Sequence, residues 1–354
     1  MSFVKWIFVL LGTAEAFAFQ SHPSIIGDGI GLDHIMIGLP GSSQAPDIFG
    51  KALGFSVLPG NTFPEEGLQQ AVILFPPAYV ELLWQYKKPD RPPSITAVPD
   101  AIAAGGGIAG INVNVSPVDA AADLMRRLGM KVSLPPSVTT RDASGKEHPG
   151  AWQFILPEAE TEAQFPKGVP GGSGVGFLEY RNNASRRDPA RYERFRARIE
   201  REVPDSRRTP GELHANTARK LLSVLVSVPN VADAVHQSER LGFAPGEERY
   251  VRDLGEKGRE VQCGIGTFVF FEVSNPKGAL SAHVKQKGLG PFGFSVSVTD
   301  LKTAQRVVEQ GTNRRFAIRK SAGRSSFMVP AAFAGGTFVE FVQEEALRGS
   351  SRTN

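Results

Sequence analysis

The segment LDHIMIGLP, residues 32–40, opens the stretch that decides the fold. It is apolar and rich in β-branched residues, and the Pro-Gly pair at its end stops it, which predicts a strand. Between 43 and 52 the apolar residues follow helical spacing, and Gly54 ends that helix. Two more apolar runs, 71–76 and 79–86, predict further strands. The stretch is therefore interpreted as a βαβββ unit.

The same pattern recurs three more times along the chain. Each unit has a strand, a helix ended by glycine, shorter strands and a final apolar strand with one central glutamate. The glycines are Gly54, Gly129, Gly242 and Gly311, and the glutamates are Glu81, Glu179, Glu272 and Glu340. One unit exposes an apolar sheet face, so units should pair to bury it. The predicted fold class is α+β, with four βαβββ modules paired into two domains.

Length and composition agree with this division. A chain of 354 residues is too long for one ordinary core and suits two domains or more. We predict domains at 30–182 and 214–345, followed by a flexible tail at 346–354. The net charge of +4 is slight, so nothing indicates nucleic acid as a general partner.

Residues 1–18 have the pattern of a secretory signal peptide. Lys5 precedes the apolar run 6–11, and small residues follow at 14, 16 and 18, as at a cleavage site. The alternative is a short anchor or a frayed hydrophobic start. The run is shorter than the ~20 residues that a membrane-spanning helix needs, and no other segment approaches that length. We therefore predict a secreted or periplasmic protein without an integral membrane segment. Cys263 is the single cysteine, so no intrachain disulfide can form.

Residues 183–213 form an arginine-rich linker between the two halves. A helix begins near Asp188-Pro189, and its apolar residues make one narrow stripe: Tyr192, Phe195, Ile199 and Val203. One interpretation is a surface for nucleic acid or an acidic membrane. The preferred one is a linker helix that docks by its stripe, with arginines partly matched by glutamates.

The repeated unit resembles the vicinal oxygen chelate superfamily, which includes glyoxalase I, extradiol dioxygenases and fosfomycin-resistance proteins. The match is closest to its glyoxalase-like branch. It rests on LDH at 32–34, YVEL at 79–82 and the loop 142–152, and it covers 30–182 well and 221–343 more loosely. The resemblance implies paired modules that curl into half-barrels. It also implies a divalent metal on the concave face, chelated by vicinal oxygens of the substrate.

Carried over by position, the resemblance implies metal ligands at His34, Glu81 and Glu179, with Glu179 also as the catalytic carboxylate. The first-strand place of module two falls on Gly110 or Ile111, neither of which can bind metal. One histidine and two glutamates suit Mn²⁺, Mg²⁺ or Fe²⁺, and Zn²⁺ less typically. The second half is expected to be metal-free, because the matching places hold Ser223, Glu272, Gly293 and Glu340.

Each candidate also has a plainer interpretation. A strand histidine is often a hydrogen-bonded core residue, and a strand glutamate commonly faces solvent. If Glu81 and Glu179 shared a cavity without metal, repulsion would raise one pKa, and that carboxylate could act as a general base. His148 and Trp152 are candidate substrate contacts. The alternatives are a surface loop histidine and a core tryptophan.

Two classes of function remain open. The first is a divalent-metal-dependent lyase, isomerase or dioxygenase acting on a small molecule with vicinal oxygens, which the His34–Glu81 pair favours. The second is a metal-free binding or sequestering protein of the same fold, which the missing fourth ligand favours. A third, an interaction scaffold through the arginine helix, would show salt-sensitive partner binding. A homodimer is compatible with all three.

Overall fold

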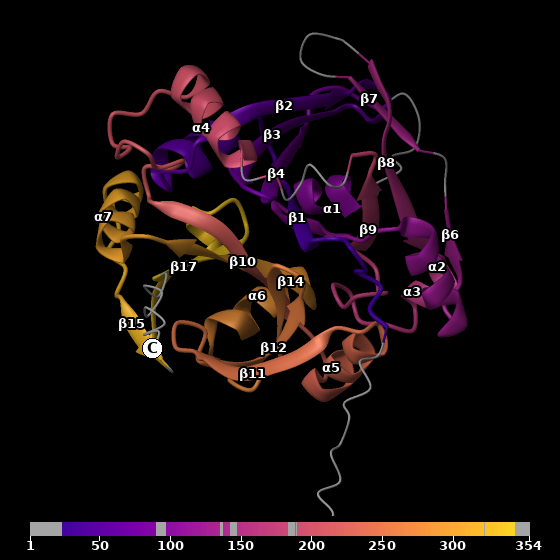
Figure 1. The fold of residues 1–354 in the computed structure, drawn as a ribbon. Helices are drawn as coiled ribbons and strands as arrows, with labels where there is room; N and C mark the ends of the chain where they lie inside the picture. The colour runs from indigo at the N-terminus through magenta and orange to yellow at the C-terminus, as the bar shows by residue number, and fades with distance from the viewer. Residues whose placement is uncertain are drawn as a thin grey trace, which may run out of the picture.

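The computed structural model of the chain describes residues 23–89, 97–134, 137–141, 147–182, 188, 190–321 and 323–343. The predicted signal peptide at 1–18 and the predicted tail at 346–354 lie outside these residues. Within the described ranges, no helix is long and apolar enough to cross a membrane. Figure 1 shows the N-terminal half, in indigo to magenta, beside the C-terminal half, in orange to yellow.

The N-terminal half folds into one nine-stranded sheet in the order β6-β8-β7-β2-β3-β4-β1-β5-β9. Strand β8 also pairs with β9, and β2 reaches β7 through Thr62 and Arg141, so the sheet curls round on itself. The first strands of modules one and two, β1 and β5, run antiparallel side by side. The strands are β1 (Gly31–Gly38), β2 (Val57–Phe63), β3 (Leu68–Phe75), β4 (Ala78–Gln85), β5 (Gly107–Asn114), β6 (Val132–Ser133), β7 (Val138–Arg141), β8 (Glu147–Pro157) and β9 (Val175–Tyr180).

The C-terminal half repeats this arrangement in an eight-stranded sheet of order β11-β12-β13-β10-β14-β17-β16-β15. Again the first strands of the two modules, β10 and β14, pair antiparallel at the centre. The predicted α+β fold of paired βαβββ modules in two domains is confirmed. The strands are β10 (Ala218–Ser227), β11 (Ala244–Val251), β12 (Glu256–Cys263), β13 (Gly266–Phe271), β14 (Gly290–Val298), β15 (Arg319–Ser321), β16 (Arg324–Val329) and β17 (Phe338–Gln343).

Each module carries one helix after its first strand, at the place where the apolar spacing predicts it. These are the π-helix η1 (Ala45–Ala52), α2 (Val118–Arg127), α5 (Val231–Arg240) and α7 (Leu301–Thr312). Asn230 and Asp300 begin α5 and α7, since their side chains accept hydrogen bonds from the backbone N–H groups of Asp233 and Thr303. The remaining helices are α1 (Ala97–Ala103), α3 (Ala159–Glu162), α4 (Ala190–Glu202), α6 (Ala279–Lys287), η2 (Pro64–Glu66) and η4 (Ala331–Phe333).

One hydrophobic core joins the two halves. It combines the module helices with one face of each sheet, which we call the outer face. The rings of Phe55 and Phe341 stack across the halves with centroids 5.7 Å apart. Gly31 and Gly264 bridge the two sheets so closely that a Cβ on Gly31 would lie 2.1 Å from the carbonyl oxygen of Cys263. Only glycine fits this crossing, where the φ of Gly31 is +82°.

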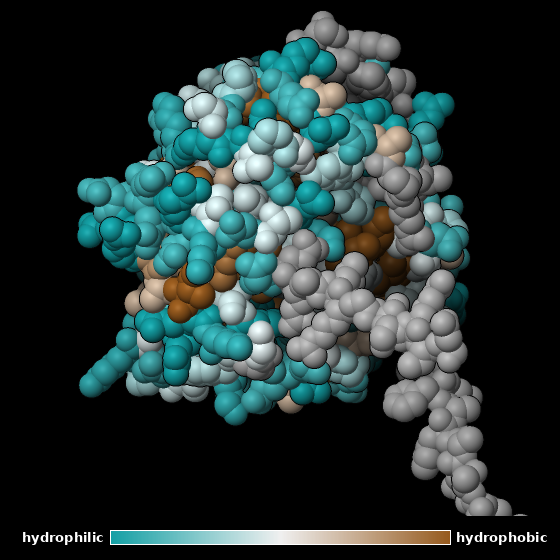
Figure 2. Space-filling view, turned by 60° about the vertical axis from the view of Figure 1, so that its left-hand side comes forward, coloured by the Kyte–Doolittle hydropathy of each residue, from teal (hydrophilic) through white to brown (hydrophobic). Residues whose placement is uncertain are grey.

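The opposite, inner face of each sheet is partly covered by a short helix that the periodicity did not predict. In the first sheet α1 packs Val98 among Met36 and Leu83. In the second, α6 packs Leu280 among residues that include Phe338. A ligand on either inner face would therefore share it with a helix. The face shown in Figure 2 is mostly hydrophilic where it is coloured, with hydrophobic residues gathered in small areas.

The arginine-rich helix α4 docks on the first half by its apolar stripe, as the sequence predicts. Ile199 is fully buried among Leu58 and Leu74. The exposed side of the helix is charged, and Arg196 pairs with Glu193 at 2.6 Å. These contacts fit a docked linker helix whose arginines are partly matched by glutamates on its solvent side.

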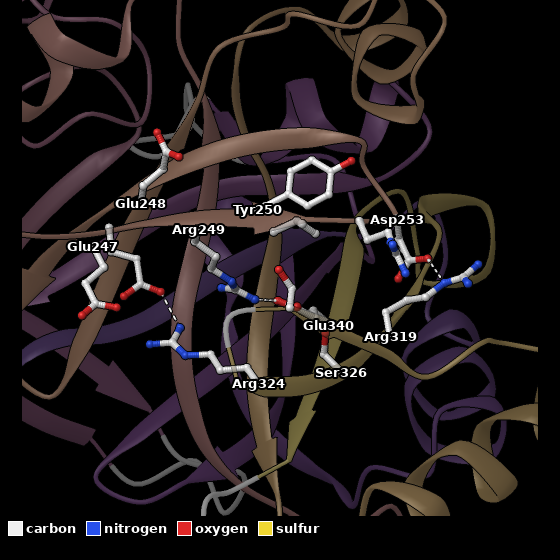
Figure 3. A pocket seen from close by; sticks show the side chains of 13 residues that line it. Glu247, Glu248, Arg249, Tyr250, Asp253, Arg319, Arg324, Ser326 and Glu340 are labelled. Atoms are coloured by element: carbon white, nitrogen blue, oxygen red, sulfur yellow. Dashed lines mark hydrogen bonds and ion pairs between the residues drawn. The ribbon is translucent and has the colours of Figure 1, made fainter.

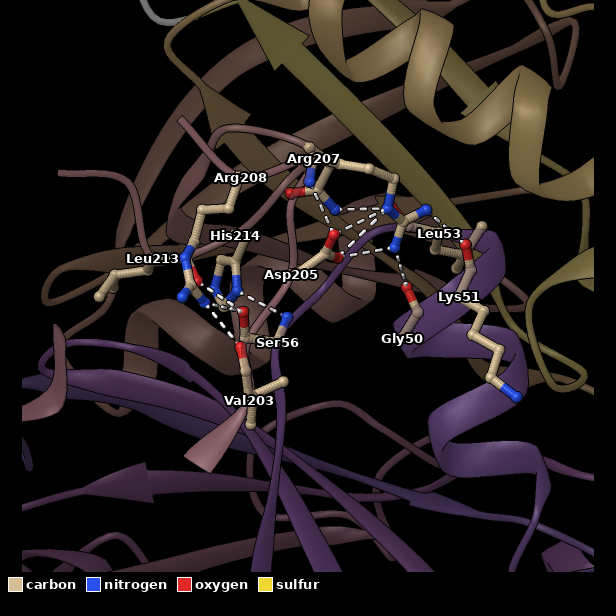
Figure 4. Close-up of polar contacts among 11 residues, drawn as sticks. Gly50, Lys51, Leu53, Ser56, Val203, Asp205, Arg207, Arg208, Leu213 and His214 are labelled. Atoms are coloured by element: carbon tan, nitrogen blue, oxygen red, sulfur yellow. Dashed lines mark hydrogen bonds and ion pairs between the residues drawn. The ribbon is translucent and has the colours of Figure 1, made fainter. Parts of the chain in front are cut away.

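The segment after α4 fastens the linker to the first half (Figure 4). Arg207 donates to the backbone carbonyl of Lys51 at 2.9 Å. His214 is fully buried: its Nδ1 accepts from the backbone N–H of Ser56 at 3.0 Å, and its Nε2 donates to the carbonyl of Leu74 at 2.9 Å. Burial lowers the pKa of His214 to about 3, so this histidine is a neutral structural link.

Candidate functional site

His34 lies in β1 on the inner face of the first sheet. A β-bulge between Leu32 and His34 turns the neighbouring Asp33 to the same side, and Asp33 Oδ2 lies 2.8 Å from His34 Nδ1. The ring of Tyr79, opposite His34 on β4, stacks on the imidazole with centroids 4.4 Å apart. Because His34 and Asp33 are both buried, the imidazole is held in one orientation.

Glu81 reaches the other side of the same imidazole. Its Oε2 lies 3.4 Å from His34 Nε2, and the side-chain amide of Gln70 donates to its Oε1. Burial raises the pKa of Glu81 above its usual 4.5, against the smaller opposing effects of His34 and Gln70. A buried carboxyl group whose pKa is raised holds its proton more readily than an exposed one, and such groups are frequent at sites that transfer protons.

Two side chains from module two complete the group. Asn112 lies opposite His34 on β5, with its Nδ2 2.8 Å from His34 Nε2. The hydroxyl of Tyr180 on β9 donates to Asp33 Oδ2 at 2.5 Å. A neutral His34 with its proton on Nδ1 satisfies both neighbours, since Asp33 then accepts and Asn112 donates. We call the following residues the His34 cluster: Asp33, His34, Gln70, Tyr79, Glu81, Asn112 and Tyr180.

Replacing Glu81 by glutamine tests whether the buried carboxylate lowers the free energy of unfolding. Below pH 4.5 Glu81 is protonated in both states, and its contribution is lost as the pH rises through the raised folded-state pKa. The side chain in Glu81→Gln cannot ionise, so the variant avoids this loss of stability. Its amide oxygen can still accept the hydrogen bond from Gln70. We expect its free energy of unfolding at pH 8 to exceed that of the wild type by about 1 kcal/mol. Urea denaturation at pH 8 measures it, and a variant less stable than the wild type there would contradict the expectation.

Glu179 lies outside the His34 cluster. Its carboxylate accepts from the Ser116 hydroxyl at 2.5 Å and from the backbone N–H of Val118 at 2.8 Å, at the start of α2. A negative charge there stabilises a helix N-terminus. Because side chains alternate along a strand, Tyr180 faces the cluster and Glu179 the opposite side. The structure does not bring Glu179 to the other two predicted ligands, and its catalytic and metal-binding roles stay predictions.

The cluster does not fit the metal site that the resemblance implies. In module one, Glu81 lies two positions beyond the β4 residue that pairs with His34. The same step in module two, from the β9 residue that pairs with Asn112, leads to Leu178. Module two thus offers an amide and an apolar side chain in place of two ligands. Among the described residues, no three histidine, cysteine, aspartate or glutamate side chains form a group that could hold a metal ion.

The inner face of the second sheet is occupied by an ion pair. Glu340 accepts from the guanidinium of Arg249 and from the Ser295 hydroxyl, the latter at 2.6 Å, and Figure 3 shows Arg249 and Glu340 pointing toward one another. Glu272, in contrast, is exposed and accepts from the backbone N–H of Val231 at 3.5 Å, at the start of α5. The four strand glutamates therefore occupy two kinds of place, inner face and helix start.

Trp152 lies in β8 opposite Tyr180. Both line a cavity of about 440 Å³, together with Gln153, Arg181 and the predicted catalytic residue Glu179. The size suits a small molecule. Since Tyr180 belongs to the His34 cluster and its hydroxyl donates to Asp33, this cavity adjoins the cluster.

Three members of the His34 cluster were not predicted from the sequence. Tyr180 directly follows Glu179, and Asn112 directly follows Ile111, so each lies one position from a predicted ligand place, whereas Gln70 lies in β3, outside the strands in which ligands were predicted. His148 lies in strand β8, paired with Thr140, and not in a loop as expected. The side chain of His148 lies outside the described part of the chain.

Paired βαβββ modules, with a polar group between the first and last strands of the first module, define a vicinal oxygen chelate protein. The chain belongs to the glyoxalase-like domain family, whose model matches residues 32–242. The resemblance stated from the sequence is confirmed. A comparison with curated proteins finds no match.

Solved structures share the fold at low sequence identity. A hypothetical protein from Staphylococcus aureus is 10% identical with a TM-score of 0.55, over 88% of this chain and 98% of that one. A mutant of 4-hydroxymandelate synthase from Streptomyces coelicolor is 13% identical with a TM-score of 0.58, over 90% and 94%. Methylmalonyl-CoA epimerase from Mycobacterium tuberculosis is 15% identical over 39% of this chain and 94% of its own, with a TM-score of 0.34. At these identities the likeness to the first two structures concerns the fold alone.

Proposed function

We propose that the first domain is an isomerase or lyase that moves a proton on a small molecule, with Glu81 and His34 as the acid–base pair and without a bound metal. The observation that carries the proposal is the imidazole of His34 held between two buried carboxylates, Asp33 at Nδ1 and Glu81 at Nε2. Two titratable groups in contact, one with a raised pKa, are a frequent arrangement in sites that transfer protons.

Each member of the pair has a defined part in such a transfer. Asp33 accepts from Nδ1 and so keeps the tautomer of His34 fixed, leaving Nε2 to act on the Glu81 side. Glu81 would take the proton from a carbon next to a carbonyl and return it to a neighbouring atom of the ligand. Asn112 and Tyr180 supply N–H and O–H donors that can turn to a developing oxyanion.

The substrate class follows from the family and the cavity. We propose a small compound with oxygen atoms on adjacent carbons, such as a 2-hydroxy ketone or a 2-hydroxy aldehyde. It would lie in the cavity of about 440 Å³ against Trp152 and reach the cluster beside Tyr180. A carbonyl next to a hydroxyl makes the intervening C–H acidic enough for general-base removal.

Proton exchange in D₂O tests the proposal without a known product. The full chain is incubated with 2-hydroxy ketones, 2-hydroxy aldehydes and 2-oxo acids, and NMR follows exchange of the C–H beside the carbonyl. We expect exchange by the wild type, slowed about 100-fold or more in His34→Ala and Glu81→Gln. Glu272→Gln, a helix-start glutamate of the other domain, is the matched control and should exchange like the wild type.

Three outcomes would overturn parts of this proposal. If the wild type exchanges the C–H proton of none of these compounds, the proposed enzymatic activity is contradicted. Loss of exchange in Glu179→Gln would restore the catalytic role predicted from the sequence. Mass spectrometry of protein purified without a histidine tag supplies the third. Near-stoichiometric manganese, iron or zinc, lost in His34→Ala and Glu81→Gln, would contradict a metal-free mechanism.

The second candidate is a binding protein without turnover. It is favoured by the closure of the cluster: His34 is 5% and Glu81 6% exposed, and Asn112 already contacts Nε2. A ligand confined to the cavity would then contact Trp152 without reaching His34. Quenching of tryptophan fluorescence by a ligand, lost in Trp152→Phe but retained in His34→Ala, would identify this case.

A further inference from the structure

The second domain contains a cavity of about 660 Å³, larger than the cavity of about 440 Å³ beside Trp152. It lies between helix α6 and the segment 314–319, beside η4. We call it the α6 groove. Its volume falls within the ~300–1,000 Å³ range of small-molecule sites.

The floor and walls of the α6 groove are largely apolar. Phe338 and Met328, from neighbouring strands of the inner face, form part of the lining and are 6% exposed. Phe316 is 8% exposed and stacks with Phe327, while its edge meets the ring of Phe333 at 6.5 Å between centroids. Such rigid aromatic walls bury an apolar body at little cost in conformational entropy.

The charged groups around the groove are mostly cationic. The Arg314 guanidinium lies 5.4 Å from the centroid of the Phe333 ring, and it makes no ion pair with any residue that the structure describes. Arg319 forms an ion pair with Asp253, with its Nε 3.7 Å from Oδ1 (Figure 3). Asp253 is the acidic residue of this lining.

The imidazole of His283 separates the groove from the space between the two domains. It packs edge-on to Phe338 with centroids 5.5 Å apart. Burial lowers the pKa of His283 to about 4, so it adds no charge at neutral pH. The groove therefore combines an apolar body with a cationic rim that holds more positive than negative charge.

We propose that the α6 groove binds a small carboxylic acid with an aromatic or medium-length aliphatic body. The body would lie against Phe316, Phe333 and Phe338, and the carboxylate would pair with Arg314 and Arg319, whose planar guanidinium groups bind carboxylates with two hydrogen bonds. This site is independent of the acid–base pair proposed in the first domain. It binds the ligand and catalyses no reaction.

Isothermal titration calorimetry on the full chain tests the proposal with 3-phenylpropionate and octanoate. The corresponding alcohols, 3-phenylpropanol and octanol, are the uncharged probes. We expect the acids to bind about tenfold or more tightly than the alcohols. Arg314→Ala combined with Arg319→Ala should remove that preference.

Two further variants separate charge from shape. Ala282 lines the groove from the exposed side of α6, so Ala282→Trp should fill it and abolish binding of acids and alcohols alike. Arg306→Ala removes an exposed arginine of α7 outside the lining and should bind like the wild type. Absence of binding by both acids, equal affinity for acids and alcohols, or unchanged binding in Ala282→Trp would each overturn the proposal.

Discussion

His214→Ala should lower the free energy of unfolding by about 4 kcal/mol. The imidazole is fully buried between the rings of Phe55 and Phe75, at 5.6 and 5.1 Å between centroids. Its removal leaves a cavity and also leaves the backbone N–H of Ser56 and the carbonyl of Leu74 without their partner. Unmade buried hydrogen bonds and lost aromatic volume each destabilise a core.

Urea denaturation at pH 7.5 measures this loss, with His214→Gln as the matched variant. Glutamine can place an amide nitrogen near Leu74 and an amide oxygen near Ser56, so it should lose clearly less than alanine does. Because His214 joins the linker to the first half, the alanine variant should also be cleaved sooner by protease within 203–213. An alanine variant within about 1 kcal/mol of the wild type would contradict the structural role.

The second large effect is a loss of stability at acidic pH that is caused by His214. In the unfolded chain His214 takes up a proton near pH 6.5, but in the folded protein it does so only near pH 3. Between these values the unfolded state binds more protons, so stability falls as the pH falls. The contribution of His214 is complete above pH 6.5 and is lost by about 1.4 kcal/mol for each pH unit below it.

Comparison of the wild type with His214→Gln isolates this contribution. His283, whose lowered pKa of about 4 acts in the same direction, and Glu81, whose raised pKa acts in the opposite one, are present in both proteins and cancel. The difference in unfolding free energy should shrink by about 2 kcal/mol between pH 6.5 and pH 5, measured in urea at several pH values. Parallel pH profiles for the two proteins would show that His214 is protonated in the fold.

The sequence determined the architecture. Helical spacing ended by glycine and alternating apolar runs placed all four module helices, and the need to bury one face of each βαβββ unit predicted the pairing of modules. The stripe of α4 likewise predicted its docking against Leu58 and Leu74. These features depend on the spacing of apolar residues within one segment, and that spacing can be read directly from the sequence of the segment.

Only the tertiary structure decided which side chains share the site. His34 and Glu81 do meet, but on β9 it is Tyr180, and not Glu179, that reaches their cluster, through Asp33. The two neighbours point to opposite faces because strand side chains alternate, so an uncertainty of one residue in register exchanges a cluster residue for a helix-start residue. Asp33 and Tyr180 are 147 residues apart, and the register between such distant strands depends on pairing and bulges, which cannot be read from spacing along the chain.

The same limit applies to the helices on the inner faces. The sequence of α1 and α6 gives no sign that they cover the concave side of each sheet, because a short helix has too few turns for a distinct apolar face. Their position decides how much of each inner face a ligand can reach. The sequence alone thus determined the fold and placed His34 and Glu81 together, while packing between distant strands decided the other members of the His34 cluster and the access to it.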